Sequence, residues 1–182
     1  MKLTKLKKAI FLDRDGVLNK EVGYLSNPND FVFLEGSIEA LKILKQKDYL
    51  LIVITNQAAV ARGFLTVETL QVIHNKMVKI LKENKISLDD IYYCPHHPEF
   101  TGPCDCRKPN PGMILKAKLK FNIDIRNSYM IGDTLSDIET GKNARCKTVL
   151  VLTGYGKKEI KKESSIIPDM IFKNLKEFAI NI

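Results

Sequence analysis

The sequence has no long hydrophobic run. Among its 182 residues, no apolar stretch approaches the roughly 20 residues that a transmembrane helix needs. The start, MKLTKLKKAI, is basic, but the apolar run that follows meets Asp13 within a few residues and is too short for a signal peptide. We therefore expect a cytoplasmic protein. In that reducing compartment, clustered cysteines more often bind metals or take part in catalysis than form disulfides.

The chain also lacks internal repeats, low-complexity linkers and a concentrated basic stripe. Its net charge of +8 comes from lysines that are scattered along the sequence, a distribution typical of a solvated surface. Hydrophobic residues make up 45% and charged residues 27%, which is ordinary for a globular protein. The length fits one domain with a real core, so we expect a single domain over residues 1–182.

Short aliphatic runs alternate with longer segments of helical period, which predicts βα units and a parallel sheet in a three-layer, Rossmann-like α/β domain. The predicted strands cover Ala9–Asp13, Leu50–Thr55, Ile91–Cys94, Tyr129–Gly132, Thr148–Leu152 and a short Met170–Phe172. The predicted helices cover Ser37–Lys47, Val67–Asn84, Gly112–Phe121, Leu135–Asn143 and a segment near the C-terminus. In such a sheet, ligands bind at the carboxyl ends of the strands.

Four motifs fall at those predicted strand ends: FLDRDGVLN, VITNQ, CRKPNPG and MIGDTLSD. Aspartates that converge there would repel one another unless a cation lay among them, and Mg²⁺ prefers such oxygen ligands. Asp13 is then placed to attack a phosphorus atom, and Asp15 to act as general acid and base. Thr55 and Lys108 would stabilise the phosphoryl oxygens. Individually, D-x-D-G also fits a turn or a calcium loop, and GDTLSD also fits a helix N-cap formed by Asp133 and Thr134.

Three of the chain's four cysteines lie in one proline-rich loop, YCPHHPEFTGPCDCRKPNPG. Cys94 and His96, followed by Cys104 and Cys106, offer three thiolates and one imidazole, a set that suits a closed, structural Zn²⁺ site. The residues alone leave open whether His96 or the adjacent His97 is the ligand. The fourth cysteine, Cys146, is interpreted as a small buried hydrophobe. His74, on a predicted helix, is interpreted as a surface or partly packed histidine.

The order of these motifs resembles that of the haloacid-dehalogenase-like (HAD-like) phosphatases. More narrowly, FLDRDGVLN, TNQAAVARG, CPHHP, CDCRKPNPGM and GDTLSD together resemble the D-glycero-D-manno-heptose 1,7-bisphosphate phosphatases, over roughly residues 9–154. The resemblance implies a bacterial enzyme that removes the C7 phosphate through a phosphoaspartate intermediate, in the synthesis of a nucleotide-activated heptose.

The resemblance also implies roles for individual residues. The catalytic set would be Asp13, Asp15, Thr55 and Lys108, and Mg²⁺ would be bound by Asp13, the Asp15 carbonyl and Asp133. The substrate-binding set would be Glu21, Val22, Gly23, Tyr24, Asn56, Gln57 and Arg107. The zinc ligands would be Cys94, His96, Cys104 and Cys106. The sequence departs from the family at Ala58 and Ala59, where a Ser-Gly pair is common, and at Thr134, where a lysine is frequent.

No large insertion separates the motifs, so the resemblance implies an open site without a separate cap domain, whose selectivity comes from short loops. Histidinol-phosphate phosphatases, which have a similar zinc loop, are an alternative family. A zinc-stabilised nucleic-acid-binding module is a second alternative, although aspartates at strand ends would repel a phosphate backbone. We expect a monomer that acts on a small sugar phosphate and binds neither nucleic acid nor membrane.

Overall fold

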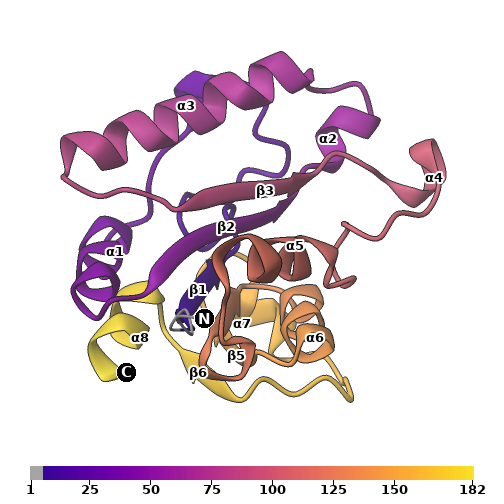
Figure 1. Ribbon diagram of the computed structural model, residues 1–182. Coiled ribbons are helices and arrows are strands. Elements are labelled where there is room, and N and C mark those ends of the chain that lie inside the picture. Colours follow the sequence, from indigo (N-terminus) through magenta and orange to yellow (C-terminus); the bar gives the residue numbers. More distant parts are fainter. Residues whose placement is uncertain (1–5) are drawn as a thin grey trace, which may run out of the picture.

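The computed structural model describes residues 6–182, which form a twisted sheet covered by helices on both faces (Figure 1). The predicted domain boundary at residue 1 and the basic start MKLTK lie outside these residues. The strands are β1 (Ala9–Leu12), β2 (Leu50–Asn56), β3 (Asp90–Cys94), β4 (Tyr129–Gly132), β5 (Lys147–Val151) and β6 (Met170–Phe172). All neighbours pair in parallel, in the order β3-β2-β1-β4-β5-β6.

The helices follow the predicted segments closely. The longer helices are α1 (Ser37–Gln46), α3 (Val67–Glu83), α5 (Gly112–Phe121), α6 (Leu135–Ala144) and α8 (Leu175–Asn181). The short turns, which the sequence analysis did not predict, are η1 (Pro28–Asp30), α2 (Ala58–Ala61), α4 (Pro98–Thr101), η2 (Ile125–Asn127) and α7 (Gly156–Glu159). Within the described part of the chain, no helix combines the length and the apolar character that crossing a bilayer requires.

Alternate side chains of the central strands enter two separate cores, because successive residues of a strand point to opposite faces. From β1, Ile10 and Leu12 pack with α1, α3 and α8, whereas Ala9 and Phe11 pack with α5 on the other face. Strand β2 divides in the same way. Both faces are therefore buried, which explains why these strands are apolar throughout. The predicted three-layer α/β class is confirmed.

The strand register aligns the ends of the three central strands. Leu12 lies opposite both Val53 of β2 and Ile131 of β4, and the Asp13 amide donates a hydrogen bond to the Ile131 carbonyl over 2.9 Å. In the sheet, β1 lies between β2 and β4. The strands β2 and β3 continue the sheet on one side of β1, and β4, β5 and β6 continue it on the other. This is the point of reversed strand order where ligands bind in open α/β sheets.

Candidate active site

A cavity of about 410 Å³ opens at the carboxyl ends of β1, β2 and β4. It collects residues from all four motifs and from two neighbouring loops. Among the predicted site residues, those that line it are Asp13, Asp15, Glu21, Gly23, Tyr24, Thr55, Asn56, Gln57, Arg107, Lys108 and Asp133. Val22 is not among the lining residues, and it is 51% exposed.

Asp13 and Lys108 form a buried ion pair in this cavity. Lys108 Nζ lies 2.9 Å from Asp13 Oδ1 and 2.5 Å from Asp137 Oδ1. Asp13 Oδ1 also accepts the Arg14 amide hydrogen at 2.7 Å. One oxygen of Asp13 is thus held by two donors, while Oδ2 accepts no hydrogen bond from the described residues, and Asp13 lines the cavity. This leaves Oδ2 able to attack an electrophile.

Asp133 is held from the opposite wall, where its Oδ2 accepts the Tyr155 amide hydrogen at 2.7 Å. Two glycines pack against this carboxylate. A Cβ atom would lie 2.1 Å from Asp133 Oδ2 if it were added at Gly16, and 2.0 Å if it were added at Gly154. Gly16 also has a φ of 77°, a left-handed conformation that favours glycine. The turn at Gly16, directly after Asp15, therefore also gives Asp133 room to approach β1.

Three carboxylates form a compact group: ligand oxygens of Asp13, Asp133 and Asp137 all lie within 4.8 Å of one another. Burial, with added repulsion from neighbouring aspartates, raises the pKa of Asp13 to about 7 and that of Asp133 to about 8. Lys108 supplies one positive charge against three negative ones. A divalent cation with a preference for oxygen ligands fits the remaining charge.

Asp15 points away from this group and toward Arg14. Its Oδ1 accepts hydrogen bonds from Arg14 and from Asn19, and its Oδ2 accepts them from Arg14 at 2.8 Å and Gln57 at 3.0 Å. Burial opposes ionisation of Asp15, but the Arg14 guanidinium and these hydrogen bonds outweigh it and leave the pKa lowered. The Asp15 side chain still borders the cavity, with 19% of it exposed, but it is not part of the group of three clustered carboxylates.

The end of β2 supplies a second set of polar groups. The Thr55 hydroxyl accepts a hydrogen bond from Gln57 Nε2 at 2.9 Å. The side-chain amide of Asn56 binds both main-chain polar groups of Lys108. Its Oδ1 accepts a hydrogen bond from the Lys108 N–H at 3.0 Å, and its Nδ2 donates one to the Lys108 carbonyl at 3.2 Å. Asn56 and Gln57 thus position other site residues in this structure, in addition to lining the cavity.

Two loops form the rim. Arg107 lines the cavity and donates a hydrogen bond from Nη1 to the His96 carbonyl at 3.0 Å. On the other side, the Tyr24 ring packs on Phe64, with centroids 5.2 Å apart. Burial raises the pKa of Glu21, which accepts a hydrogen bond from the Gly23 amide.

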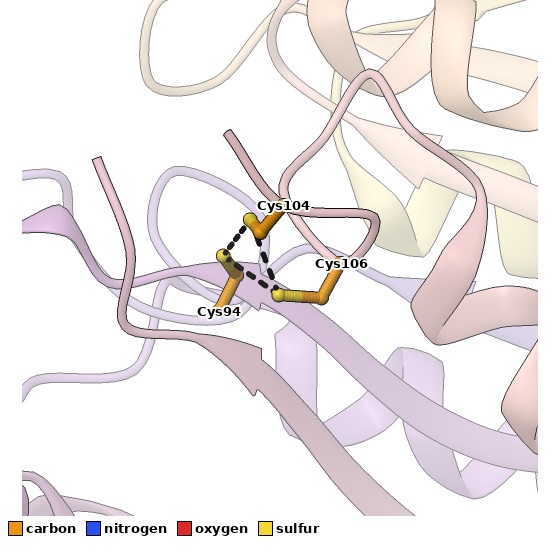
Figure 2. A group of neighbouring side chains, drawn as sticks. All are labelled: Cys94, Cys104 and Cys106. Carbon is orange, nitrogen blue, oxygen red and sulfur yellow. Dashed lines mark hydrogen bonds between the residues drawn. The ribbon is translucent and has the colours of Figure 1, made fainter. Parts of the chain in front are cut away.

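Three cysteine side chains in the loop that precedes Arg107 point toward one another, and their sulfurs lie close together (Figure 2). The Sγ atoms are 3.1 Å apart for Cys94 and Cys106, 3.4 Å for Cys104 and Cys106, and 3.6 Å for Cys94 and Cys104. All three cysteines are free thiols. A tetrahedral zinc ion with Zn–S bonds of about 2.3 Å would separate its sulfurs by about 3.7 Å, so the spacing suits a metal. The ring of His96 is not part of the group that lies within 4.8 Å.

Sequence reasoning missed two buried partners of the catalytic motif. Arg14, inside D-R-D-G, is 0% exposed and holds Asp15. The interpretation of His74 as a surface or partly packed residue is wrong: it is 2% exposed, and its Nε2 lies 3.2 Å from Arg14 Nη1. The available signal was helical spacing, since His74 lies four residues after Leu70 and three before Met77 on one face of α3. Cys146 is buried in the core, as predicted.

The N-cap alternative for GDTLSD is half right. Thr134 caps α6, and the Asp137 side chain accepts a hydrogen bond from the Thr134 amide at 3.1 Å. The cap is formed by Thr134 and Asp137, whereas the Asp133 side chain accepts its hydrogen bond from the Tyr155 amide. Asp137, four residues after Asp133, both caps the helix and forms an ion pair with Lys108.

Curated relatives match almost the whole chain. A D-glycero-beta-D-manno-heptose-1,7-bisphosphate 7-phosphatase from Pasteurella multocida is 45% identical, over 94% of this chain and 100% of its own. One with the same name from Escherichia coli K12 is 41% identical, over 95% of this chain and 92% of its own. The HAD-hydrolase-like family model matches residues 105–178.

Solved structures agree with these relatives. The D,D-heptose 1,7-bisphosphate phosphatase of B. bronchiseptica, complexed with magnesium and phosphate, superposes with a TM-score of 0.89 at 34% identity, covering 95% of this chain and 96% of that one. The corresponding protein from Burkholderia thailandensis gives a TM-score of 0.74 at 28% identity, covering 96% and 97%. The chain therefore belongs to the heptose-1,7-bisphosphate 7-phosphatase family of the HAD-like hydrolases.

Proposed function

We propose that this protein is a Mg²⁺-dependent phosphatase that removes the C7 phosphate of D-glycero-D-manno-heptose 1,7-bisphosphate, for the synthesis of a nucleotide-activated heptose. The observation that carries the proposal is the Asp13 carboxylate, paired with Lys108 at the floor of a cavity on the carboxyl edge of the sheet. The names of the relatives supply the substrate.

Asp13 is the proposed nucleophile. Its Oδ2 forms a bond to phosphorus while the bond from phosphorus to the C7 oxygen breaks, and the electron pair goes to that oxygen. Asp15 takes part in its protonated form: the Arg14 guanidinium lowers its pKa in this structure, but the negative charge of a bound phosphate favours a proton there, and Asp15 gives that proton to the leaving alkoxide. Asp15, now ionised, then takes a proton from a water molecule, which attacks the phosphoaspartate and returns Asp13 as a free carboxylate. The two aspartates thus end the cycle as they began it.

Thr55 and Lys108 stabilise the phosphoryl oxygens as charge develops on them. The amide of Asn56 supports this role, because it fixes both backbone groups of Lys108. Asp137 supports it from the other side, because its ion pair at 2.5 Å keeps the lysine charged in a buried place. Asn56 and Asp137 therefore contribute by fixing the position of the Lys108 side chain.

Mg²⁺ would be held by Asp13, the Asp15 carbonyl and Asp133. The donor set fits, since buried carboxylates lie close together with too little positive charge around them. When bound, Mg²⁺ neutralises charge on the phosphoryl group and keeps its carboxylate ligands ionised.

The sugar would be bound by the rim of the cavity. Arg107 offers a fork of donors for an anionic or hydroxyl group, and residues 21–24 form the opposite wall. Asn56 and Gln57 complete the assigned set from the end of β2. Val22 would contact substrate only from the outer edge of the rim, given its exposure. Selectivity would lie in these short loops, because residues 6–182 contain no separate cap domain over the site.

Zn²⁺ would be bound by Cys94, Cys104 and Cys106, with His96 as the fourth ligand. The converged sulfurs support the metal site. A closed site of this kind would stabilise a proline-rich loop directly before Arg107 and Lys108, and so fix where those cations point. We further propose one domain over residues 1–182, a monomer, and a cytoplasmic location, where these thiols would stay reduced.

The test is a kinetic comparison of purified protein on the α and β anomers of heptose 1,7-bisphosphate, with histidinol phosphate as the competing substrate. We expect kcat/KM to be highest for one of the bisphosphates, and activity to require Mg²⁺. A higher kcat/KM for histidinol phosphate would reject the proposed substrate in favour of the alternative family.

A further inference from the structure

Arg14 lies between the two proposed catalytic aspartates and is completely buried. It grips the Asp15 carboxylate through a fork of hydrogen bonds: Nε donates to Oδ1 at 3.2 Å, and Nη2 donates to Oδ1 at 3.1 Å and to Oδ2 at 2.8 Å. A planar guanidinium that bonds both oxygens of a carboxylate fixes the plane of that carboxylate as well as its position.

The rest of the guanidinium is anchored as well. Nη2 donates to Gln57 Oε1 at 3.0 Å, and Nη1 lies 3.2 Å from Nε2 of His74. Because a guanidinium can only donate, His74 must accept through Nε2 and carry its proton on Nδ1. Burial and the nearby Arg14 charge lower the pKa of His74 to about 4, which agrees with a neutral imidazole.

His74 is itself fixed by rigid structure. It lies on the buried face of α3, between the core residues Ile73 and Met77, and its ring packs against Tyr93 of β3 with centroids 5.6 Å apart. A continuous path of contacts therefore runs from α3 through His74 and Arg14 to Asp15. Without the His74 acceptor, the guanidinium loses one of the contacts that fix its plane.

We propose that Arg14 and His74 are positioning residues, which hold the Asp15 carboxylate in the orientation needed for proton transfer. The inference rests on the proposed function, in which Asp15 protonates the leaving group and later activates water. It adds α3 to the parts of the molecule that determine the rate, although α3 lines none of the catalytic cavity.

The first test uses leaving groups. An alkoxide needs a proton when it leaves, whereas 4-nitrophenolate needs almost none, so a defect in Asp15 positioning slows phosphoryl transfer only from the former. Hydrolysis of the phosphoaspartate is common to all substrates, so the comparison uses kcat/KM, which reports the steps up to phosphoryl transfer. His74→Phe keeps a ring against Tyr93 and removes the acceptor. We expect it to lower kcat/KM for heptose 1,7-bisphosphate and for glucose 6-phosphate about 10- to 100-fold, within the range of general acid–base catalysis, and for 4-nitrophenyl phosphate less than about 3-fold.

Two further variants control this comparison. His74→Gln restores an acceptor oxygen and should recover most of the activity on the two alkyl phosphates. Asn75→Ala, at the exposed next position of α3, should leave all three substrates unchanged. Equal losses on alkyl and aryl phosphates in His74→Phe, or a failure of His74→Gln to recover activity, would overturn the proposal, because both outcomes indicate a purely structural role.

The second test is a double-mutant cycle with Asp15. If His74 acts through Asp15, then adding His74→Phe to Asp15→Asn should change kcat by less than about 2-fold. An undiminished effect of His74→Phe in that background would reject the coupling. Should His74→Phe fail to fold, Arg14→Lys serves in both tests, since it keeps the charge and loses the fork.

These outcomes are separable from failure of the proposed function. A wild-type protein that hydrolyses 4-nitrophenyl phosphate and glucose 6-phosphate but not heptose 1,7-bisphosphate would refute the proposed substrate. The leaving-group comparison would then still be decided by the other two compounds.

Discussion

At the scale of single residues, the ionised groups of the cavity are arranged so that each oxygen has a separate task. Asp13 Oδ1 accepts hydrogen bonds from Lys108 and the Arg14 amide, and both oxygens of Asp15 are held by Arg14. This leaves Asp13 Oδ2 as the reactive atom. The proposed covalent mechanism depends on that atom being an ionised carboxylate oxygen.

Asp13→Asn should therefore abolish turnover, lowering kcat at least about a thousand-fold, as removal of a catalytic nucleophile does. Zinc content and the circular dichroism spectrum should stay as in the wild type. Asp30→Asn, on the exposed turn η1, removes the same charge far from the chemistry and should keep full activity. Appreciable turnover by Asp13→Asn would exclude the phosphoaspartate intermediate.

Gly16→Ala should weaken Mg²⁺ binding, because the added Cβ would lie 2.1 Å from Asp133 Oδ2 and force that ligand away. Gly63→Ala is the matched control: its φ of 74° lies close to the 77° of Gly16, but nothing lies within 4 Å of its Cβ position. Both variants carry backbone strain of about 1–2 kcal/mol. Titration of activity with Mg²⁺ should show a higher half-saturating concentration for Gly16→Ala alone; a parallel shift in both variants would contradict this account.

At the scale of elements, the cysteine loop is attached to the catalytic strand. Cys94 ends β3 directly opposite Asn56 of β2, and the Gln57 amide donates to the Cys94 carbonyl at 2.7 Å. The same loop then returns to the cavity with Arg107 and Lys108. A metal that closed this loop would therefore act on the positions of both cations without entering the reaction.

Cys104→Ser should lower zinc content and the thermal unfolding temperature, because one of the converged thiolates is lost. It should also raise KM, since Arg107 would lose a fixed support. Cys146→Ala changes a cysteine outside the loop and should leave the zinc content unaltered, whatever its effect on packing. Elemental analysis of carefully prepared wild-type protein provides the decisive measurement, and an absence of zinc from it would refute the structural metal site.

At the scale of the whole molecule, two cores share one sheet, and the catalytic cavity lies where the strand order reverses between β1 and β4. His74 connects one of these cores to the cavity, because it is buried on the α3 side of the sheet and also contacts Arg14. Its protonation state should therefore affect the global unfolding equilibrium.

Burial lowers the pKa of His74 from 6.5 to about 4 in the folded protein, so the unfolded chain takes up a proton first as the pH falls. The stabilisation is complete above about pH 6.5 and is lost between 6.5 and 4. Between pH 7 and 5 this one group should cost about 2 kcal/mol of unfolding free energy.

Urea unfolding at both pH values, with saturating Mg²⁺ to hold the carboxylates ionised, measures this loss. His74→Gln has no titrating ring and should lose less stability than the wild type over the same interval. Identical pH dependence in the two proteins would show that His74 does not titrate with a depressed pKa.

Much of this architecture could be predicted from local patterns. The uniformly apolar strands predicted a sheet buried on both faces, and apolar periodicity predicted α1, α3, α5 and α6 to within one residue at each end. The catalytic carboxylates and the cysteine loop were also predictable, because their chemistry depends on residue types at short spacings. Short helical turns such as α2 and α7 were not predictable, because four residues are too few to show a helical repeat of apolar positions.

The sequence by itself determined the class of fold, the chemistry available at the strand ends and the thiols available for a metal. Only the tertiary structure decided which side chains meet. It brought His74 60 positions along the chain to Arg14, turned the Asp15 carboxylate away from the acidic group, and placed Asp137 on Lys108. The physical reason is that such contacts join residues distant in sequence, whose approach depends on how helices pack on the sheet and not on any local preference of the chain.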